Sequence, residues 1–388
     1  MTKLEDVTQK LSPKRLIIPV LFGLLAASWL LYSNLTSPVF EQVDPGLGNY
    51  SWVDGNADGV VDLENEAEFA LEEGGDYVLI KPYVKLSSIN WTGWTFFWIF
   101  ISVLMVVFRD LGYMIRIRLL TDNQLSWRQS FDTIMLWEFA SALTPSVVGG
   151  SGLAVFILKR EGISLGRSTA VVLVTALLDE LFYIITVPIV FLLIPYALLF
   201  PEVDYVDVKS VFMLGFGFIL FLTISISLGV FMIPRAFKYF LLKIFSLPIL
   251  RKWRKKVGEV GDEIIVASKT FRGKPFVFWL KAFGATFFSW TARYWVVNCL
   301  MMAFFVVDDH LLVYARQLVM WVIMLISPTP GGSGIAEVAF SSFLRDQMDL
   351  AFVGALALVW RLMTYYPYLF VGVIILPKWL KRTAKKKT

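Results

Sequence analysis

The chain has 388 residues, of which 57% are hydrophobic and only 17% charged, and its formal net charge is +5. Soluble domains are about half apolar and about one quarter charged, so this composition excludes an ordinary soluble protein and predicts one that crosses a membrane several times. The single cysteine excludes an internal disulfide, and the single histidine argues against a zinc site or a histidine-based catalytic triad.

Residues 1–35 begin with a polar stretch and continue with an apolar run from about Leu16 to Leu35. We interpret this segment as an N-terminal anchor helix. A cleaved signal peptide is the alternative, but the apolar region of such a peptide is shorter, at about 7–15 residues.

Residues 36–90 form an acidic insert, in which Tyr77 to Ile80 are expected to add a short strand. The stretch 54–62 resembles the first nine positions of an EF-hand or dockerin-type calcium loop, with oxygen-bearing residues at alternate positions and a glycine at the sharp turn. The twelfth position holds Asn65 instead of a carboxylate. A solvated acidic turn is the alternative, and any calcium here would be structural. The expected ligands are Asp54, Asn56, Asp58, Val60, Asp62 and Glu66.

Five apolar runs follow the insert, and with the anchor helix they give about six full membrane spans. The first of them is expected to end at Arg109, which places Arg116 and Arg118 in a basic loop. The expected spans cover about 91–108, 168–188, 210–233, 276–307 and 350–376.

Lysine and arginine are concentrated in the loop after 91–108, in 234–275 and in the tail 377–388. By the positive-inside rule these segments and both termini are cytoplasmic, in the cell inner membrane, and the acidic insert lies outside. Apolar residues interleave with the basic ones in 234–275, which predicts amphipathic helices on anionic inner-leaflet lipids. A nucleic-acid patch is the weaker alternative, and we expect no nucleic-acid partner.

Two further apolar segments, 131–158 and 311–344, are interrupted by similar stretches, TPSVVGGSGLA and SPTPGGSGIA, whose glycines are 182 residues apart. Proline and glycine break helices, and the backbone groups that a break exposes survive in a membrane only inside protein or beside a water-filled cavity. We therefore expect two re-entrant hairpins, the first entering from the cytoplasm and turning at 145–152, the second entering from outside. Close helix packing at small residues is the alternative.

The predicted fold is an all-α polytopic membrane protein in which a span, a broken hairpin and a further span occur twice in opposite directions. The halves of this inverted-topology repeat cover about 91–233 and 275–376 within a domain of 91–376. Such repeats place the substrate site near the membrane midplane. The displacement of 182 residues also relates Asp179 to Arg361 and Tyr183 to Tyr365.

Ionisable residues inside the predicted spans are energetically costly and are usually functional, although structural salt bridges are the alternative. Arginines can bind a phosphate through two parallel hydrogen bonds, and the helix after the second turn offers free N–H groups to an anion. Carboxylates can hold a cationic group or carry protons. The candidate substrate-binding residues are Glu138, Pro145, Gly149, Gly150, Ser151, Asp179, Glu180, Arg293, Arg316, Pro330, Gly331, Gly332, Ser333, Gly334, Glu337 and Arg361.

Several of these stretches resemble the lysylphosphatidylglycerol synthase transmembrane, or flippase-like, family over roughly residues 91–376. They are KREGIS at 159–164, the pair Asp179-Glu180, and PTPGGSGIAE at 328–337 with Arg361. The first turn departs from many members, because it has Gly150-Ser151 where they have a Gly-Glu pair. The soluble aminoacyl-transferase domain of the full synthases does not follow the last span, so the resemblance implies lipid translocation and not lipid synthesis.

We therefore expect a non-enzymatic lipid flippase or transporter of the inner membrane, which passes a phosphate-bearing headgroup between leaflets by alternating access. Apart from the calcium considered above, no cofactor is expected. The sequence has no nucleotide-binding motif, so transport would be downhill or coupled to an ion. An intramembrane transferase acting on a lipid-linked substrate, with Glu337 or Asp179 as base, is the enzymatic alternative. A non-catalytic partner of a lipid-modifying enzyme is the third.

Overall fold

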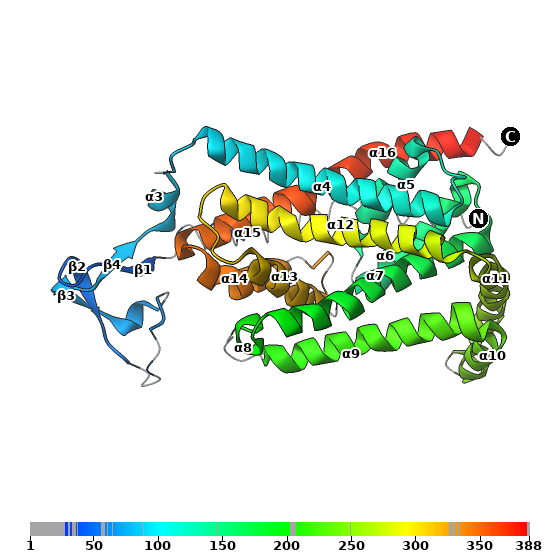
Figure 1. Cartoon of the computed structure of the whole chain (residues 1–388), viewed down its shortest axis with the longest axis horizontal. Helices are drawn as coiled ribbons and strands as arrows, with labels where there is room; N and C mark the ends of the chain where they lie inside the picture. The colour runs from blue at the N-terminus through cyan, green and yellow to red at the C-terminus, as the bar shows by residue number, and fades with distance from the viewer. Residues whose placement is uncertain are drawn as a thin grey trace.

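A computed structural model of the chain describes residues 38–385 except 56–58, 60, 64, 88, 145, 202–206, 249, 326–328, 330 and 333, together with the isolated residues 28, 29, 32 and 36. The predicted anchor helix therefore lies outside the described residues except for isolated positions. The molecule is elongated, with a small sheet at one end and long helices that run toward the other (Figure 1).

The acidic insert folds into a four-stranded antiparallel sheet, which an all-α fold does not contain. The sequence indicated only its last strand. Phe40 and Phe69 are buried and stack on each other with ring centroids 3.8 Å apart, which gives the sheet its own apolar centre. In the order of pairing the strands are β1 (Val39–Gln42), β4 (Tyr77–Ile80), β2 (Gly48–Trp52) and β3 (Phe69–Gly75).

Helices and the short loops between them form the rest of the described chain, and α3 (Pro82–Ser87) joins the sheet to them. The helices of the first half and the connecting region are α4 (Gly93–Leu120), α5 (Trp127–Leu143), α6 (Ser146–Glu161), α7 (Leu165–Leu193), α8 (Tyr196–Leu199), α9 (Val208–Ser227), α10 (Pro234–Ile244) and α11 (Arg254–Arg272). Those of the second half are α12 (Phe276–Met302), α13 (His310–Met324), α14 (Ile335–Leu344), α15 (Leu350–Thr364) and α16 (Tyr366–Lys385).

Four helical stretches of the described chain are long and apolar enough to cross a membrane. They are α4, α7, α9 and the stretch Phe352–Ala384, which includes most of α15 and α16. Helix α12 has 27 residues against 28 for α4, is not among these four stretches, and contains Lys281, Arg293 and several tryptophans. Large apolar side chains such as Phe100, Leu214 and Phe370 are exposed on the outer faces of these helices, as expected where lipid replaces water as the surrounding medium.

Helices α4 and α12 pack against each other in antiparallel directions. The hydroxyl of Ser102 donates to the carbonyl of Val296 at 2.9 Å, and the hydroxyl of Ser289 donates to the carbonyl of Arg109 at the same distance. At Gly112 a Cβ atom would lie 2.3 Å from the Ser289 hydroxyl, so only glycine allows this approach. Small residues and interhelical hydrogen bonds are the usual means of joining helices within a membrane.

The bounds of corresponding helices agree with the displacement found in the sequence. Moved by 182 residues, α4 would cover 275–302 and α5 would cover 309–325, which are close to the bounds of α12 and α13. The helices of the two interrupted segments have 17, 16, 15 and 10 residues, fewer than the about 20 that cross a bilayer. Helices α13 and α14 lie toward the sheet, whereas α5 lies toward the opposite end (Figure 1).

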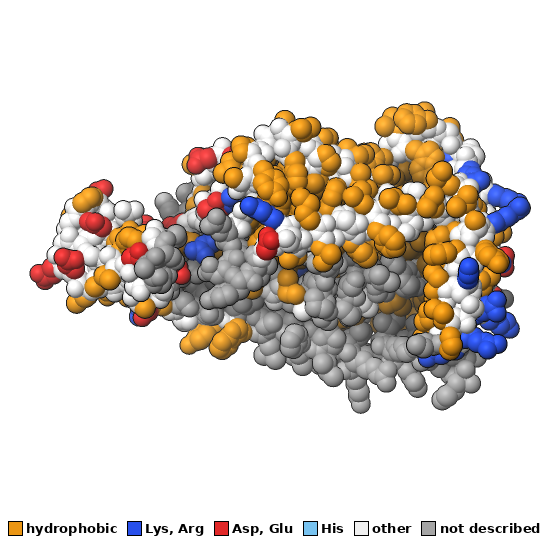
Figure 2. All heavy atoms as spheres, turned by 90° about the horizontal axis from the view of Figure 1, so that it is seen from below, with side chains coloured by type: hydrophobic (Ala, Val, Ile, Leu, Met, Phe, Trp, Pro, Cys, Tyr) orange, Lys and Arg blue, Asp and Glu red, His pale blue; other side chains and the backbone are white. Residues whose placement is uncertain are grey.

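The basic segment forms α10 and α11, which lie across the end of the molecule opposite the sheet (Figure 1). On the face shown in Figure 2, lysine and arginine side chains gather at this end, acidic side chains gather on the sheet, and apolar side chains cover much of the surface between. Helix α10 exposes Tyr239 and Phe240 beside its basic residues, so the helix is amphipathic as the sequence indicated.

Candidate functional site

A cavity of about 310 Å³ lies inside the helical body, between the inner ends of the two interrupted segments. Glu138, Thr144 and Ser151 reach it from the first segment, and Trp321 and Gly331 reach it from the second. The remaining walls come from α4, α7, α9, α12, α15 and the start of α16. The two similar glycine-containing stretches, far apart in the sequence, therefore line one cavity.

Arg293 on α12 is the most available cation in this cavity. Its guanidinium lies 4.9 Å from the ring centre of Trp290 and 4.4 Å from that of Trp321, and its side chain is 14% exposed. The nearest carboxylate oxygen, on Glu138, is 3.9 Å away and already lies 2.6 Å from Nη2 of Arg109. Among the described residues, Arg293 thus has aromatic neighbours and a shared carboxylate but no hydrogen-bond acceptor of its own.

Helix α4 extends beyond Arg109 to Leu120, so the prediction that Arg116 lies in a basic loop is wrong. Both arginines are buried, and Arg116 donates two hydrogen bonds to Asp179 on α7, at 2.5 and 3.3 Å. Arg109, Tyr113, Arg116 and Leu120 are spaced by three or four residues and so share the inner face of α4. That spacing indicates a helix that continues past Arg109. The continuation was not predicted, because the adjacent charges of Arg109 and Asp110 were interpreted as the end of the span.

The second glycine stretch forms a true turn between α13 and α14. Gly331, Gly332 and Gly334 have φ angles of +58°, +69° and +84°, values that residues with a side chain rarely adopt. The carboxylate of Glu337 accepts a hydrogen bond from the N–H of Gly334 at 2.7 Å, and its other oxygen accepts one from Arg361 at 3.0 Å. Helix α14 thus caps itself, and its first turn is not open to an anion at that N–H.

The first glycine stretch is different: α5 and α6 are separate helices, but the predicted turn over 145–152 does not include the glycines. Helix α6 begins at Ser146, and the glycines lie inside its first turns. A Cβ at Gly150 would lie 2.1 Å from the hydroxyl of Ser141 on α5, so glycine is needed there for close helix contact. This is the packing role that the sequence left as the alternative. Pro145, Pro330 and Ser333 lie outside the described residues.

The acidic residues Asp179 and Glu180 both line the cavity but have different partners. Asp179 accepts hydrogen bonds from Arg116 and from the indole of Trp290, the latter at 2.8 Å. Glu180 accepts one from the hydroxyl of Thr223 on α9, at 2.9 Å.

Some of the described candidate residues do not line the cavity. Arg316 is buried on α13, where it pairs with Asp346 and donates to the carbonyl of Leu198 at 2.7 Å. Glu337 lies behind the cavity-lining Arg361. Aromatic residues that the sequence did not indicate also line the wall, because they carry no charge to mark them within an apolar segment. They are Tyr113, Trp137, Trp290, Trp321, Trp360 and Tyr368.

In the insert, the described part of the predicted calcium loop contains Asp54 and Asp62, whereas Asn56, Asp58 and Val60 lie outside it. The predicted last ligand, Glu66, is exposed, and Asn65 caps the short helical turn that it begins. The carboxylate facing this loop belongs to Glu68, which accepts hydrogen bonds from the N–H of Asp62 at 3.1 Å and from the amide of Asn65 at 3.0 Å. The described residues contain no group of three or more acidic, histidine or cysteine side chains that could hold a metal ion.

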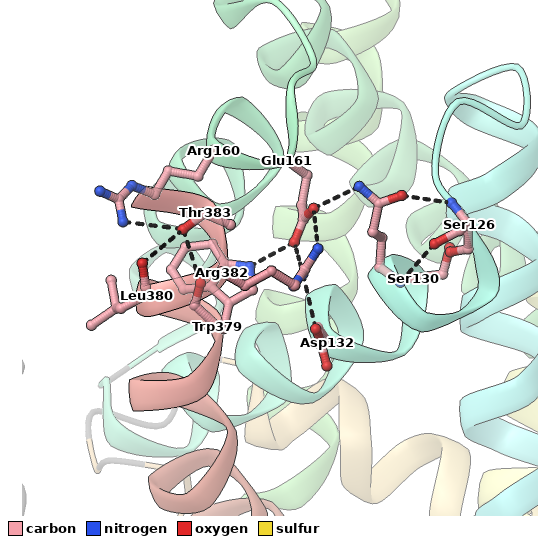
Figure 3. A network of polar contacts seen from close by, with 10 residues as sticks. Ser126, Ser130, Asp132, Arg160, Glu161, Trp379, Leu380, Arg382 and Thr383 are labelled. Carbon is pink, nitrogen blue, oxygen red and sulfur yellow. Dashed lines mark hydrogen bonds and ion pairs between the residues drawn. The ribbon is translucent and has the colours of Figure 1, made fainter. Parts of the chain in front are cut away.

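A buried polar network ties the C-terminal helix to the first interrupted segment (Figure 3). Glu161, at the end of α6, accepts hydrogen bonds from the indole of Trp379 and from Gln129, both at 2.7 Å, and pairs with Arg382. Arg382 also pairs with Asp132 on α5 at 2.9 Å. The KREGIS motif thus supplies the carboxylate that holds α16 against α5 and α6.

The four long apolar helical stretches of the described chain define a polytopic membrane protein, and the charge-lined cavity lies between its helices. The family model described as the lysylphosphatidylglycerol synthase TM region matches residues 82–372, so the chain belongs to that family, and the resemblance inferred from the motifs is confirmed. A curated relative, a UPF0104 membrane protein from Archaeoglobus fulgidus, is 26% identical over 302 residues, which cover 71% of this chain and 84% of the relative. No solved structure matches the chain.

Proposed function

We propose that the protein moves the phosphate-bearing headgroup of a membrane lipid between the two leaflets. The observation that carries the proposal is Arg293, an arginine inside the cavity whose nearest carboxylate already pairs with another arginine. A guanidinium in that position gains most from a phosphate, because hydrogen bonds between ionised groups are about twice as strong as neutral ones. The rings of Trp290 and Trp321 lie within cation–π distance of the guanidinium, an interaction that supports its charge without supplying a hydrogen-bond acceptor.

The two interrupted segments would be re-entrant hairpins of an inverted repeat. Three observations support this: their helices are too short to cross a bilayer, α4 and α12 are antiparallel, and corresponding helix bounds differ by nearly the same number of residues. Transporters built in this way expose a central site alternately to the two sides by rocking one repeat against the other.

The end that carries α10 and α11 would face the cytoplasm, and the acidic sheet would face outward. The separation of basic and acidic side chains in Figure 2 supports this orientation. Helix α10, with exposed aromatic side chains beside Arg235 and Lys238, would then rest on anionic lipids of the inner leaflet.

Reconstitution into liposomes tests the proposal. The full chain is incorporated with fluorescent phosphatidylglycerol, lipid in the outer leaflet is bleached by dithionite, and the lipids are analysed by mass spectrometry afterwards. Movement of unchanged lipid beyond that of protein-free liposomes supports translocation. A new lipid product would instead indicate a transferase, and neither movement nor product would leave the role of a non-catalytic partner.

A further inference from the structure

Glu180 differs from the other carboxylates in the cavity wall because it has no close cation among the described residues. The role inferred for it below rests on the proposed function. Glu138 and Asp179 each have an arginine nitrogen within 2.6 Å. In the described part of the chain Glu180 has no basic nitrogen within 4.0 Å, and the single hydrogen bond to its carboxylate comes from Thr223. An ionised carboxylate within a membrane protein is costly when no cation compensates it.

The charges around Glu180 explain why its protonation matters for an anion. Its neighbours on α7, Asp179 and Tyr183, are bound to Arg116 and to the hydroxyl of Tyr294, respectively, and the other charged groups facing the cavity come from four further helices. Those groups are Arg116 on α4, Glu138 on α5, Arg293 on α12 and Arg361 on α15. Glu138 and Asp179 each have a close arginine partner, and Arg361 has Glu337. Glu180 is therefore the carboxylate of the cavity wall that has no close cation within the described structure.

A phosphate that enters beside Arg293 brings a further negative charge into the same cavity as Glu180. Two negative charges in a cavity of this size repel each other, and in a poorly solvated site the repulsion is much larger than in water. We infer that Glu180 takes up one proton from water when a phosphate-bearing headgroup binds, so that proton and headgroup enter and leave the cavity together. One O–H bond forms on the carboxylate and is broken again on release, and no bond in the lipid changes.

A metal cation is a poorer occupant of this position than a proton. Cations such as calcium and magnesium need about six or more oxygen ligands, whereas Glu180 has one threonine hydroxyl bonded to it. By linkage, a headgroup that raises the proton affinity of Glu180 must itself bind more tightly when Glu180 is protonated. The inference therefore predicts both proton uptake on binding and pH-dependent binding.

The test uses the full chain in detergent, with dihexanoyl phosphatidylglycerol as the probe. Lipid binding is measured by calorimetry, and proton uptake is measured from a pH indicator in weak buffer. Uptake should approach one proton per bound lipid where free Glu180 is ionised, and affinity should fall by about tenfold per pH unit there. Glu180→Gln should bind lipid with no proton uptake and no pH dependence, whereas Glu180→Asp should retain both.

Two further variants separate this role from a structural one. Thr223→Val removes the hydrogen bond to the ionised carboxylate, so the pH range of proton uptake should move upward. Glu259→Gln, at an exposed position on α11, is the matched control and should behave as the unmodified chain.

Lipid binding without proton uptake, or unchanged uptake in Glu180→Gln, would overturn the inference and leave the proposed function standing. A preference for phosphatidylethanolamine that disappears in Glu180→Gln, without any proton uptake, would overturn it in favour of an ammonium-binding role. Absence of lipid binding at every pH would remove the proposed function and the inference together.

Discussion

Arg361 on α15 and Glu337 on α14 form a buried ion pair that fixes the second glycine turn. Nε of Arg361 lies 3.0 Å from one carboxylate oxygen of Glu337, and Nη2 donates to the carbonyl of Gly331 at 3.1 Å. The guanidinium also lies 3.9 Å from the ring centre of Tyr365. One arginine thereby holds the turn, the helix that follows it and the aromatic residue at the junction of α15 and α16.

Replacement of Glu337 by glutamine should destabilise the protein strongly. The change leaves the buried guanidinium of Arg361 without its countercharge, and breaking a buried pair costs about 3–5 kcal/mol. Thermal unfolding in detergent, followed by tryptophan fluorescence, measures the effect. Arg361→Lys should lose less stability, because lysine keeps the positive charge opposite Glu337. It should still lose some, because lysine cannot reach both Glu337 and Gly331 with a planar fork. An unchanged unfolding temperature in Glu337→Gln would contradict the assigned pairing.

The two glycine stretches should respond differently to alanine. Gly334 has a φ angle of +84°, so Gly334→Ala should cost about 1–2 kcal/mol of unfolding free energy in backbone strain alone. Gly152 lies in α6, and a Cβ atom added there would meet nothing within 4 Å, so Gly152→Ala should stabilise the helix by up to about 1 kcal/mol. The comparison is made by thermal unfolding of both variants. A similar loss in both would show that the first stretch also forms a strained turn.

Glu161 should be essential for holding α16 in place. Its side chain is fully buried, with donors from Gln129, Trp379 and Arg382, so Glu161→Gln leaves Arg382 with Asp132 as its remaining acidic partner. We expect a loss of about 3 kcal/mol in unfolding free energy and faster proteolysis of the C-terminal helix. Lys159→Gln, two residues earlier and exposed, is the control. Equal proteolysis rates in the two variants would argue against the network as the fastening of α16.

The loop after α4 makes stability depend on acid. Partial burial opposes ionisation of Asp122, but hydrogen bonds from Lys274 and Arg167, at 2.5 and 2.6 Å, outweigh it and lower the pKa of this carboxyl below its ordinary value of 3.8. A lowered folded-state pKa means that the stabilisation is fully present above the unfolded-state pKa and is lost as the pH falls through the folded-state pKa.

The variant Asp122→Asn should therefore melt below the unmodified chain at pH 6 to 7, and the difference should shrink below about pH 4 as the carboxyl is protonated. Melting temperatures of both proteins across this range provide the measurement. A difference that stays constant down to pH 3 would mean that the charge of Asp122 is not what joins α4 to Arg167 and Lys274.

The sequence was informative where hydrophobicity and charge act over whole segments. Long apolar runs predicted where α4, α7, α9 and α12 begin to within three residues, because a membrane imposes length and composition together. The predicted ends were five or six residues away for α7, α9 and α12, and twelve residues short for α4. The embedded charges Glu138, Asp179, Glu180, Arg293 and Arg361 were selected because burial of charge is costly, and all of them line the cavity.

Where local sequence has two structural outcomes, the prediction was wrong or incomplete. The two GGSG stretches have the same letters, but in the first the glycines follow Ser146-Val147-Val148, which already begin α6, whereas in the second they follow directly after Pro330. The pairing of Arg116 with Asp179 depends on how α4 and α7 pack, which periodicity within one helix does not reveal. The sheet was missed because its strands are short and lack clear alternation.

Lipid movement by Arg293→Gln and Lys281→Gln, compared in the same proteoliposomes, tests the role of the cavity most directly. Both variants remove one positive charge from α12, but Arg293 lines the cavity and Lys281 is exposed elsewhere on the helix. Loss of a charged hydrogen bond to phosphate should slow headgroup movement about tenfold to a hundredfold in Arg293→Gln, with Lys281→Gln unchanged. Equal rates in both variants and the unmodified chain would contradict headgroup binding at Arg293.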